Sequence, residues 1–405
     1  EVFTMIRLTL GNEFNVDVVP LFESVSDLEN ASTVMENVYC NQLYRDHIIR
    51  RDNIQTIMLG FSDGTKDGGY LTANWSILKA KESLTKVSRK FGIKVLFFDG
   101  RGGPPARGGG NTHQFYSSLG DFIESDEIQL TVQGQTISSN FGTIKSSQYN
   151  MEQLISSGIK NRILSNSEVF NKKNRKTIEK LSSISYNSYK DFKSHPSFIP
   201  YLEKMSTIKY YSKTNIGSRP SKRGVKGEAF NFDKLRAIPF VGSWNQLKQN
   251  VPGFYGLGTS INHFYKNNKI KDVKLLYEEV PFFRALVSNS MMSLTKSFFE
   301  LTSYMSKDEE FGEFWKIIHD EYILTKKMLL KISNFKELME NEPANKLSIQ
   351  TRENVVMPLI TIQQYALQIV KEIESGEIDD KRISVYEKII TRSLYGNINA
   401  SRNSA

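Results

Sequence analysis

In the first part of the chain, short hydrophobic runs alternate with segments whose apolar residues recur at helical spacing. Four runs rich in β-branched and other apolar residues have the pattern of buried strands. They are residues 16–22, 55–61, 94–98 and 128–132. Between the second and third runs, residues 70–91 carry apolar side chains at helical spacing. Strands alternating with helices favour parallel pairing, so residues 1–145 are predicted to form part of an α/β barrel or open sheet; four strands are too few to close a barrel.

The pattern changes at about residue 148, and the rest of the chain has the periodicity of helices. Long helical segments are predicted at residues 287–304, 311–332, 356–376 and 384–395. Their clearest interruption is residues 213–234, where Gly, Ser, Pro and basic residues (GSRPSKRGVKG) predict a basic loop. The expected fold class is therefore α/β and predominantly α-helical, with an all-helical region over residues 146–405.

A glycine-rich segment follows the third predicted strand. Residues 99–110 have the sequence DGRGGPPARGGG, and α/β folds place active sites at the carboxyl ends of strands. Glycines let backbone N–H groups approach an anion, while Arg101 and Arg107 can each offer a bidentate fork to phosphate or carboxylate. The alternative is an RGG-type nucleic-acid segment, but such segments are normally repeated and disordered. The pattern favours an anion site.

Acidic residues close the first two predicted strands. Glu23 follows the first (VVPLFE), and Asp63 follows the second, with Lys66 close behind (LGFSDGTKDGG). Carboxylates at neighbouring strand ends can share a hard cation, and Mg²⁺ suits such a site because it binds few carboxylates and keeps waters. On pattern alone, solvated carboxylates or pairing with a lysine is the commoner arrangement.

Two further arginines lie beyond the sheet. Arg219 is in the basic loop, and Arg236 begins an apolar segment (RAIPFVGSWNQ) that is predicted to be helical. A charge at the start of an apolar helix is costly to bury without an anion or carboxylate partner. By charge count alone, a solvated basic loop or a nucleic-acid patch is favoured over an active-site role.

Composition narrows the class of protein. The chain has 405 residues, a formal charge of +9 and 39% hydrophobic residues, which is ordinary for a globular protein. It has no run of eighteen apolar residues and no signal-peptide pattern, so a soluble, cytoplasmic protein is expected. Cys40 is the only cysteine, which excludes an intrachain disulfide. Because the chain opens on Glu1 and enters an apolar run at once, we expect it to be part of a longer protein.

Seven ordered motifs resemble those of the phosphoenolpyruvate carboxylase family. They are VVPLFE, SDGTKDGG, GRGGPPARGGG, LTVQGQ, GSRPSKR, RAIPFVGSWNQ and the terminal SRNSA. The resemblance runs from Val18 to Ala405 and corresponds to the C-terminal half of a family member. It implies the C-terminal part of an eight-stranded α/β barrel followed by a large helical region.

The resemblance also implies a reaction and a set of site residues. The family joins phosphoenolpyruvate and bicarbonate to give oxaloacetate and phosphate, through carboxyphosphate and an enolate stabilised by Mg²⁺ or Mn²⁺. In this sequence, the implied metal ligands are Glu23 and Asp63. The implied catalytic residues are Lys66, Arg101, Arg107, Arg219 and Arg236. Such an enzyme is a carbon–carbon lyase that replenishes the tricarboxylic acid cycle.

The family is also allosteric and usually homotetrameric. Aspartate or malate inhibits its members at a separate site, which Arg107, Lys296, Arg352 and Asn403 match here. Neither nucleic acid nor a membrane is an expected partner.

Several features depart from the family pattern. The glycine-rich motif of the family begins with His, where this chain has Asp99, and its Thr-Glu-Gln-Gly-Glu motif has Val132 and Gln135 in place of the two carboxylates. We expect Asp99 to be compensated by Arg101, another arginine or the metal, since a carboxylate beside phosphate is otherwise unfavourable. The catalytic histidine and one substrate-side arginine belong to the N-terminal half of the family. None of the five histidines here matches that catalytic role, although His113 fits the local motif.

Three hypotheses follow from the sequence. The first is a phosphoenolpyruvate carboxylase whose activity needs an N-terminal half absent from this chain. The second is a non-catalytic relative that binds metabolites or partners, suggested by Asp99 and the altered LTVQGQ segment. The third, nucleic-acid binding, depends only on net charge and one RGG element.

Overall fold

The computed structural model describes residues 1–101, 103–120, 122–132, 135–163, 170–211, 232, 235–378 and 381–401. Four strands form one parallel sheet in sequential order: β1 (Leu21–Phe22), β2 (Ile54–Leu59), β3 (Lys94–Asp99) and β4 (Ile128–Leu130). The predicted α/β class with predominantly helical content is confirmed, and all four strands lie where the hydrophobic runs place them.

The first strand is much shorter than the sequence predicts. Residues 16–20 run outside the sheet. Pro20 explains the difference because proline has no N–H to donate to a strand ladder, although its carbonyl oxygen accepts a hydrogen bond from Met58 N (2.9 Å). Val16 and Val19 are consequently exposed.

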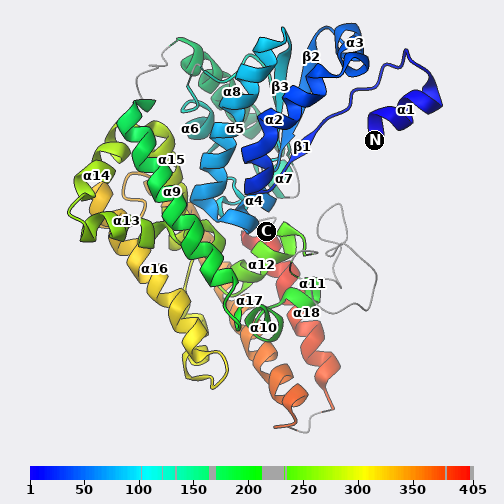
Figure 1. Ribbon diagram of the computed structural model, residues 1–405. Coiled ribbons are helices and arrows are strands. Elements are labelled where there is room, and N and C mark those ends of the chain that lie inside the picture. Colours follow the sequence, from blue (N-terminus) through cyan, green and yellow to red (C-terminus); the bar gives the residue numbers. More distant parts are fainter. Residues whose placement is uncertain are drawn as a thin grey trace.

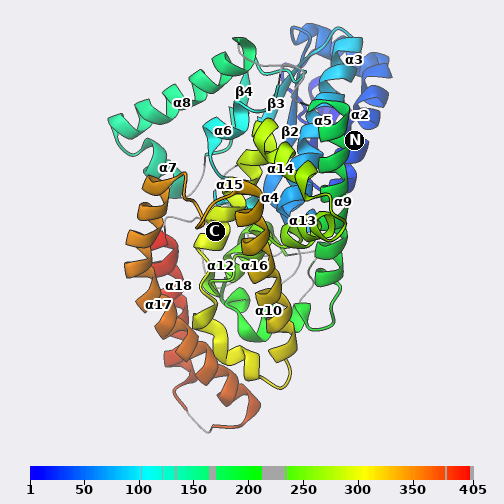
Figure 2. The same ribbon diagram turned by 90° about the vertical axis from the view of Figure 1, so that its left-hand side faces the viewer.

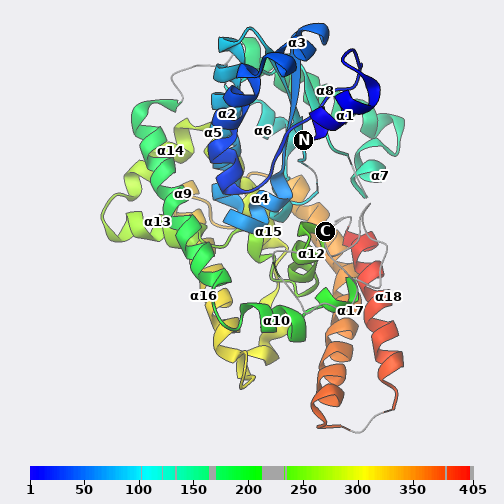
Figure 3. The same cartoon turned by 45° about the vertical axis from the view of Figure 1, so that its right-hand side comes forward.

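Helices connect the strands and cover the sheet. They are α2 (Val25–Cys40), α3 (Gln42–Arg50), α4 (Phe61–Gly68) and α5 (Tyr70–Lys90). Helix α5 confirms the segment predicted at residues 70–91 and buries Trp75 and Leu84. Helices α2 and α5 pack side by side (Figures 1 and 3). The chain breaks between α4 and α5 at Gly69, whose φ of 77° favours glycine.

Other helices make up most of the described chain. Before the helical region lie α1 (Val2–Leu10), the 3₁₀ helix η1 (Pro105–Arg107), α6 (Thr112–Tyr116) and α7 (Gln135–Phe141). After them come α8 (Ile144–Ile163), α9 (Lys172–Lys193), α10 (Phe198–Met205), α11 (Ile208–Tyr211), α12 (Ala237–Gln246), η3 (Val251–Gly253), α13 (Leu257–Lys266), α14 (Ile270–Glu279), α15 (Pro281–Thr295), η4 (Phe299–Lys307), α16 (Gly312–Ser333), α17 (Pro343–Ser375) and α18 (Ile383–Ser401). Within the described ranges, no helix combines the length and apolar character needed to cross a bilayer.

The helix predicted over residues 287–304 is divided in the structure. Helix α15 ends at Thr295, and a separate 3₁₀ helix, η4, begins at Phe299. Between them, Phe298 N donates to the carbonyl oxygen of Lys248 (2.8 Å), a partner 50 residues earlier in the chain. Because this bond replaces the helical one, the helix cannot continue, and no local sequence pattern signals it.

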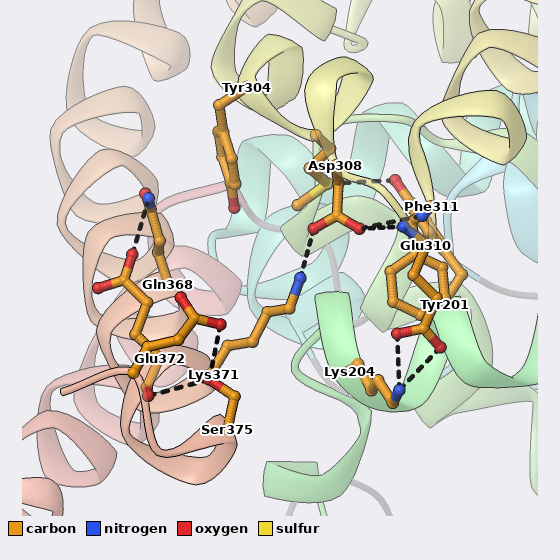
Figure 4. Close-up of polar contacts among 12 residues, drawn as sticks. Tyr201, Lys204, Tyr304, Asp308, Glu310, Phe311, Gln368, Lys371, Glu372 and Ser375 are labelled. Atoms are coloured by element: carbon orange, nitrogen blue, oxygen red, sulfur yellow. Dashed lines mark hydrogen bonds and ion pairs between the residues drawn. The ribbon is translucent and has the colours of Figure 1, made fainter.

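Helices α17 and α18 form an antiparallel hairpin beside the helical body (Figure 3). Buried apolar side chains of both helices pack against Tyr210 and Tyr211 of α11. Lys371 on α17 also forms an ion pair with Asp308, which follows η4. Close to this pair, Lys204 Nζ on α10 lies 2.7 Å from Glu310 Oε2 (Figure 4). A cavity of about 180 Å³ lies among these elements, but its lysines are already paired with carboxylates of the chain.

Two hydrophobic clusters meet near the glycine-rich segment. The larger joins the sheet to the helices through residues such as Phe97, Trp75 and Phe282. The second is centred on aromatic side chains around Trp244 and includes Ala106 of the glycine-rich segment. The segment is thus held between the two clusters.

Candidate active site

The carboxyl ends of the strands lie in one row. Phe22 pairs with Leu59, Leu59 with Asp99, and Asp99 with Leu130, so each strand ends at the same level of the sheet. The residues that follow the first three strands therefore begin side by side, as the parallel topology predicts. Glu23, the first turn of α4 and the glycine-rich segment all start at this edge.

Glu23 lies across the start of α4. A Cβ atom built on Gly60 would fall 2.7 Å from Glu23 Cγ, and one built on Gly64 would fall 3.0 Å from Glu23 O. The first distance is shorter than real Cβ contacts, and the second is tighter than most of them. The two glycines therefore make room for Glu23 beside the turn that carries Asp63.

Asp63 lies close enough to Arg107 for its negative charge to stabilise the guanidinium. Burial lowers the pKa of the Arg107 guanidinium to about 10, and the negative charge of Asp63 counters this effect. Arg107 is only 2% exposed, and its carbonyl oxygen accepts a hydrogen bond from Ser62 Oγ (3.2 Å). The structure thus brings the predicted metal ligand and the predicted anion ligand to one place, with Arg107 still protonated at neutral pH.

Three glycines in the segment have backbone angles that other residues rarely adopt. Gly103, Gly108 and Gly110 have φ values of 77°, 76° and 108°. A Cβ on Gly110 would also lie 2.3 Å from Asn289 Oδ1 on α15. That oxygen accepts a hydrogen bond from Asn111 N (3.3 Å), while Asn289 Nδ2 donates to Tyr70 Oη (2.9 Å). The segment is therefore a fixed turn anchored to α15 and α5.

Arg101 helps to hold that turn. Its guanidinium donates to the carbonyl oxygens of Gly109 (3.2 Å) and Asn111 (3.3 Å) and lies 4.4 Å from the centre of the Phe115 ring. The Nε of Arg101 is buried and has no hydrogen-bond partner among the described residues. Burial lowers the pKa of Arg101. Arg101 therefore holds the turn through two hydrogen bonds, while its Nε keeps no partner among the described residues.

Asp99 is compensated, but by a lysine rather than by the arginine or metal that the sequence suggests. Its carboxylate accepts from Lys81 Nζ and from Tyr116 Oη, both at 2.6 Å to Oδ2. Asp99 and Lys81 are almost completely buried. The sequence analysis missed Lys81 because a lysine on a long helix is usually a solvated side chain.

Lys66 lies one turn after Asp63 on α4, and its ammonium points to the beginning of α12. Lys66 Nζ donates to the carbonyl oxygens of Phe232 (2.8 Å) and Leu235 (2.6 Å). Arg236 is the N-cap residue of α12, which confirms the predicted helix. Arg219 and Asn403 lie outside the described residues.

A cavity of about 640 Å³ opens beside the glycine-rich segment. Its lining residues include Arg101, His113, Val132, Lys296 and Arg352. Helices α7, α8 and α17 contribute lining residues, and Figure 2 shows that α17 lies below α7 and α8. The two predicted effector residues therefore share a cavity with the predicted phosphate ligand.

Lys296 and Arg352 also line a smaller neighbouring pocket with Lys248 and Glu353. Burial, together with the charges of Lys248 and Arg352, lowers the pKa of the Lys296 ammonium to about 8. Glu353 opposes this effect and accepts from Lys248 Nζ at 2.6 Å. The pocket is strongly cationic. No sequence motif indicated Lys248 as one of its lining residues.

The remaining histidines lie outside this arrangement or are packed against rings. His47 is buried and stacks on Phe14 with ring centres 4.5 Å apart, while His195 and His319 lie against Phe314 and Trp315. These contacts are structural.

A comparison with protein families matches most of the chain. The family model for phosphoenolpyruvate carboxylase matches residues 4–400, almost the entire chain. The match confirms the resemblance carried by the ordered motifs, and it includes both the sheet edge and the helical region. The chain belongs to the phosphoenolpyruvate carboxylase family.

Proposed function

We propose that this chain carries the phosphate and metal site for the carboxylation of phosphoenolpyruvate by bicarbonate, which yields oxaloacetate and phosphate. The observation that carries the proposal is the meeting of Asp63 and Arg107 beside Glu23 at one edge of the sheet. An anionic substrate and a divalent cation need this combination of cations and hard oxygen ligands in close proximity.

The arginines would bind the phosphoryl and carboxyl groups. Arg101 reaches the large cavity, and its buried Nε lacks a partner in the described part of the chain. Arg107 is held by the fixed turn, and Arg236 stands at the N-terminus of α12, where the helix dipole adds positive potential. Arg219 and Lys66 complete the proposed catalytic set.

Glu23 and Asp63 would hold Mg²⁺ or Mn²⁺. Both supply carboxylate oxygens, and the glycines at positions 60 and 64 leave room for Glu23 beside the turn of Asp63. Within the described residues, no group of three or more His, Cys, Asp or Glu side chains could hold a metal, so the two carboxylates would share the ion with water or substrate. The bound cation supplies Lewis-acid stabilisation of developing negative charge on oxygen.

The cationic residues would act mainly by neutralising charge. Bicarbonate attacks phosphorus, the bond between phosphorus and the enol oxygen breaks, and carboxyphosphate and the enolate of pyruvate result. Arg101 and Arg107 would offset the charge on the phosphoryl oxygens as it moves to bicarbonate. Carboxyphosphate then gives carbon dioxide and phosphate, and the enolate carbon attacks carbon dioxide where water is excluded.

The second cationic group would bind a dicarboxylate inhibitor. Lys296 and Arg352 share the cavity with Arg101, which lies two residues from the end of β3. We propose that aspartate or malate binds there, with Arg107 and Asn403 as further ligands. A cytoplasmic homotetramer with an anaplerotic role fits this proposal.

Oxaloacetate formation tests the proposed function. Phosphoenolpyruvate, bicarbonate and Mg²⁺ are supplied to this chain and to a version extended upstream, and NADH oxidation by malate dehydrogenase is followed. We expect activity in the extended form that Arg107→Met abolishes and Lys204→Met leaves unchanged. If neither form makes oxaloacetate while phosphoenolpyruvate still binds, the non-catalytic alternative replaces this proposal.

A further inference from the structure

Lys81 and Asp99 form a buried ion pair at the point where the glycine-rich segment leaves the sheet. Lys81 lies on α5, and Asp99 is the last residue of β3. Their side chains are 1% and 0% exposed, and Lys81 Nζ lies 2.6 Å from Asp99 Oδ2. A buried pair of charges is costly to break, because either partner left alone keeps an uncompensated charge.

Tyr116 closes the cluster from the other end of the segment. Its hydroxyl donates to Asp99 Oδ2 (2.6 Å), and Lys81 Nζ lies 5.7 Å from the centre of its ring. Asp99 Oδ1 is buried without a hydrogen-bond partner in the described ranges. The carboxylate therefore depends on Lys81 for its charge balance. Through Tyr116, it also connects the end of β3 to α6, the helix that follows the turn.

The cluster lies behind the anion site rather than in it. Arg101 and the residues of the turn line the 640 Å³ cavity, whereas Lys81, Asp99 and Tyr116 are not among its lining residues. Asp99 is nevertheless close enough to Arg101 for its negative charge to raise the pKa of that guanidinium against the effect of burial. The charge of Asp99 thus acts on Arg101 through the protein interior, where screening by water and salt is weak.

The net charge near the turn is the sum of the charges of Lys81, Asp99 and Arg101. With Lys81 present, the charges of Lys81 and Asp99 cancel and Arg101 provides the net positive charge toward the cavity. Without Lys81, Asp99 would offset Arg101 itself, and the cavity would lose attraction for an anion. A purely structural pair would behave differently, since removing either partner would harm the site equally.

We propose that Lys81 is a positioning residue of the anion site, which neutralises Asp99 so that Arg101 keeps its charge for the substrate phosphate. This inference rests on the proposed function, because it assumes that the cavity beside Arg101 receives phosphoenolpyruvate. It also assigns Asp99 to the support of the turn and not to contact with the substrate.

Binding of phosphoenolpyruvate to the full chain tests the proposal. The affinity is measured by calorimetry with Mg²⁺ and without bicarbonate for wild type, Lys81→Met, Asp99→Asn and the double variant. We expect Lys81→Met to weaken binding by about tenfold, whereas Asp99→Asn leaves it unchanged or tighter. The double variant should regain affinity close to that of wild type, and Lys81→Arg should retain it.

The opposite signs of the two single variants distinguish charge from structure. Equal weakening by Lys81→Met and Asp99→Asn, or a double variant weaker than both, would overturn the proposal. If Lys81→Met does not fold, the affinities of Asp99→Asn and the double variant still test the proposal. Weak binding by a folded double variant would contradict charge cancellation. The matched control is Lys79→Met on the same helix, whose ammonium pairs with the exposed Glu179 (2.9 Å) and should not affect binding.

The wild-type chain separates this inference from the proposed function. If wild type binds no phosphoenolpyruvate, the proposed function fails and the inference fails with it. If wild type binds and Lys81→Met binds equally well, only the role of Lys81 is refuted.

Discussion

The ammonium of Lys66 donates to the carbonyl oxygen of Leu235 at 2.6 Å, which connects positions 169 residues apart in the chain. Lys66 is 9% exposed, and Phe232 O accepts a second bond from it. The bonds tie α4, which carries Asp63, to the residue just before Arg236. Lys66 therefore connects α4 to the start of α12.

Replacing Lys66 by Met should destabilise the protein and impair substrate binding together. Two carbonyl oxygens would lose a charged donor, and an unsatisfied buried acceptor costs about 1–3 kcal/mol. Urea unfolding measures this change. The control Lys204→Met removes an ion pair in which both side chains are about half exposed, so it should change stability by less than about 1 kcal/mol. Equal losses in the two variants would contradict a special role for Lys66.

The positions of Glu23 and Asp63 could be predicted from the sequence because they depend on strand periodicity alone. Parallel strands present their carboxyl ends at one edge, and the row Phe22, Leu59 and Asp99 has that geometry. The short β1 was the exception, since Pro20 interrupts the run of apolar residues.

The partner of Asp99 could not be predicted in the same way. Lys81 is 18 residues from Asp99 and lies on a different element, so only the packing of α5 on the sheet brings the two together. For the same reason, the end of α15 depends on a bond from Phe298 to Lys248 that has no local signal. Lys296 and Arg352 were indicated by the family resemblance and not by any pattern of their own.

Gly60→Ala should weaken metal binding more than it weakens the fold. The backbone of Gly60 has φ −90° and ψ 109°, which alanine adopts without strain. The new methyl group would lie 2.7 Å from Glu23 Cγ, so the Glu23 side chain must move. We expect at least a tenfold loss of Mn²⁺ affinity, measured by electron paramagnetic resonance in the absence of substrate.

Gly158→Ala is the matched control for this substitution. Gly158 lies on α8, and a Cβ there would meet no atom within 4 Å. Alanine favours a helix over glycine by up to about 1 kcal/mol, so stability should be unchanged or slightly higher and Mn²⁺ affinity unaltered. Unchanged Mn²⁺ affinity in Gly60→Ala would count against Glu23 as a metal ligand.

Arg107→Lys should lower kcat/KM for phosphoenolpyruvate by on the order of 10²-fold, although the charge is retained. Lysine lacks the planar fork that binds phosphate through two parallel bonds, and the 3₁₀ helix η1 fixes the origin of the side chain. Steady-state kinetics measures the effect in the form of the protein that is active. Arg89→Lys, at an exposed ion pair with Glu124, is the control and should have wild-type kinetics. A similar kcat/KM in Arg107→Lys would show that charge alone is required.

Malate binding should weaken as the pH rises through about 8, because the proposed inhibitor site needs the charged form of Lys296. Burial beside Lys248 and Arg352 lowers the pKa of Lys296 to about 8, well below its ordinary value near 10.5. The ammonium is therefore disfavoured in the folded state, so this group contributes stability that increases from about pH 8 to pH 10.5. The affinity for a dianion falls as the pH rises over the same range.

Calorimetry with malate at pH 7 and pH 9 measures the change in affinity, and malate has no amine that titrates in this range. Lys296→Met should bind malate weakly with the same affinity at both values of pH. A wild-type affinity that does not vary with pH, or a Lys296→Met variant that keeps the wild-type dependence, would remove Lys296 from the inhibitor site.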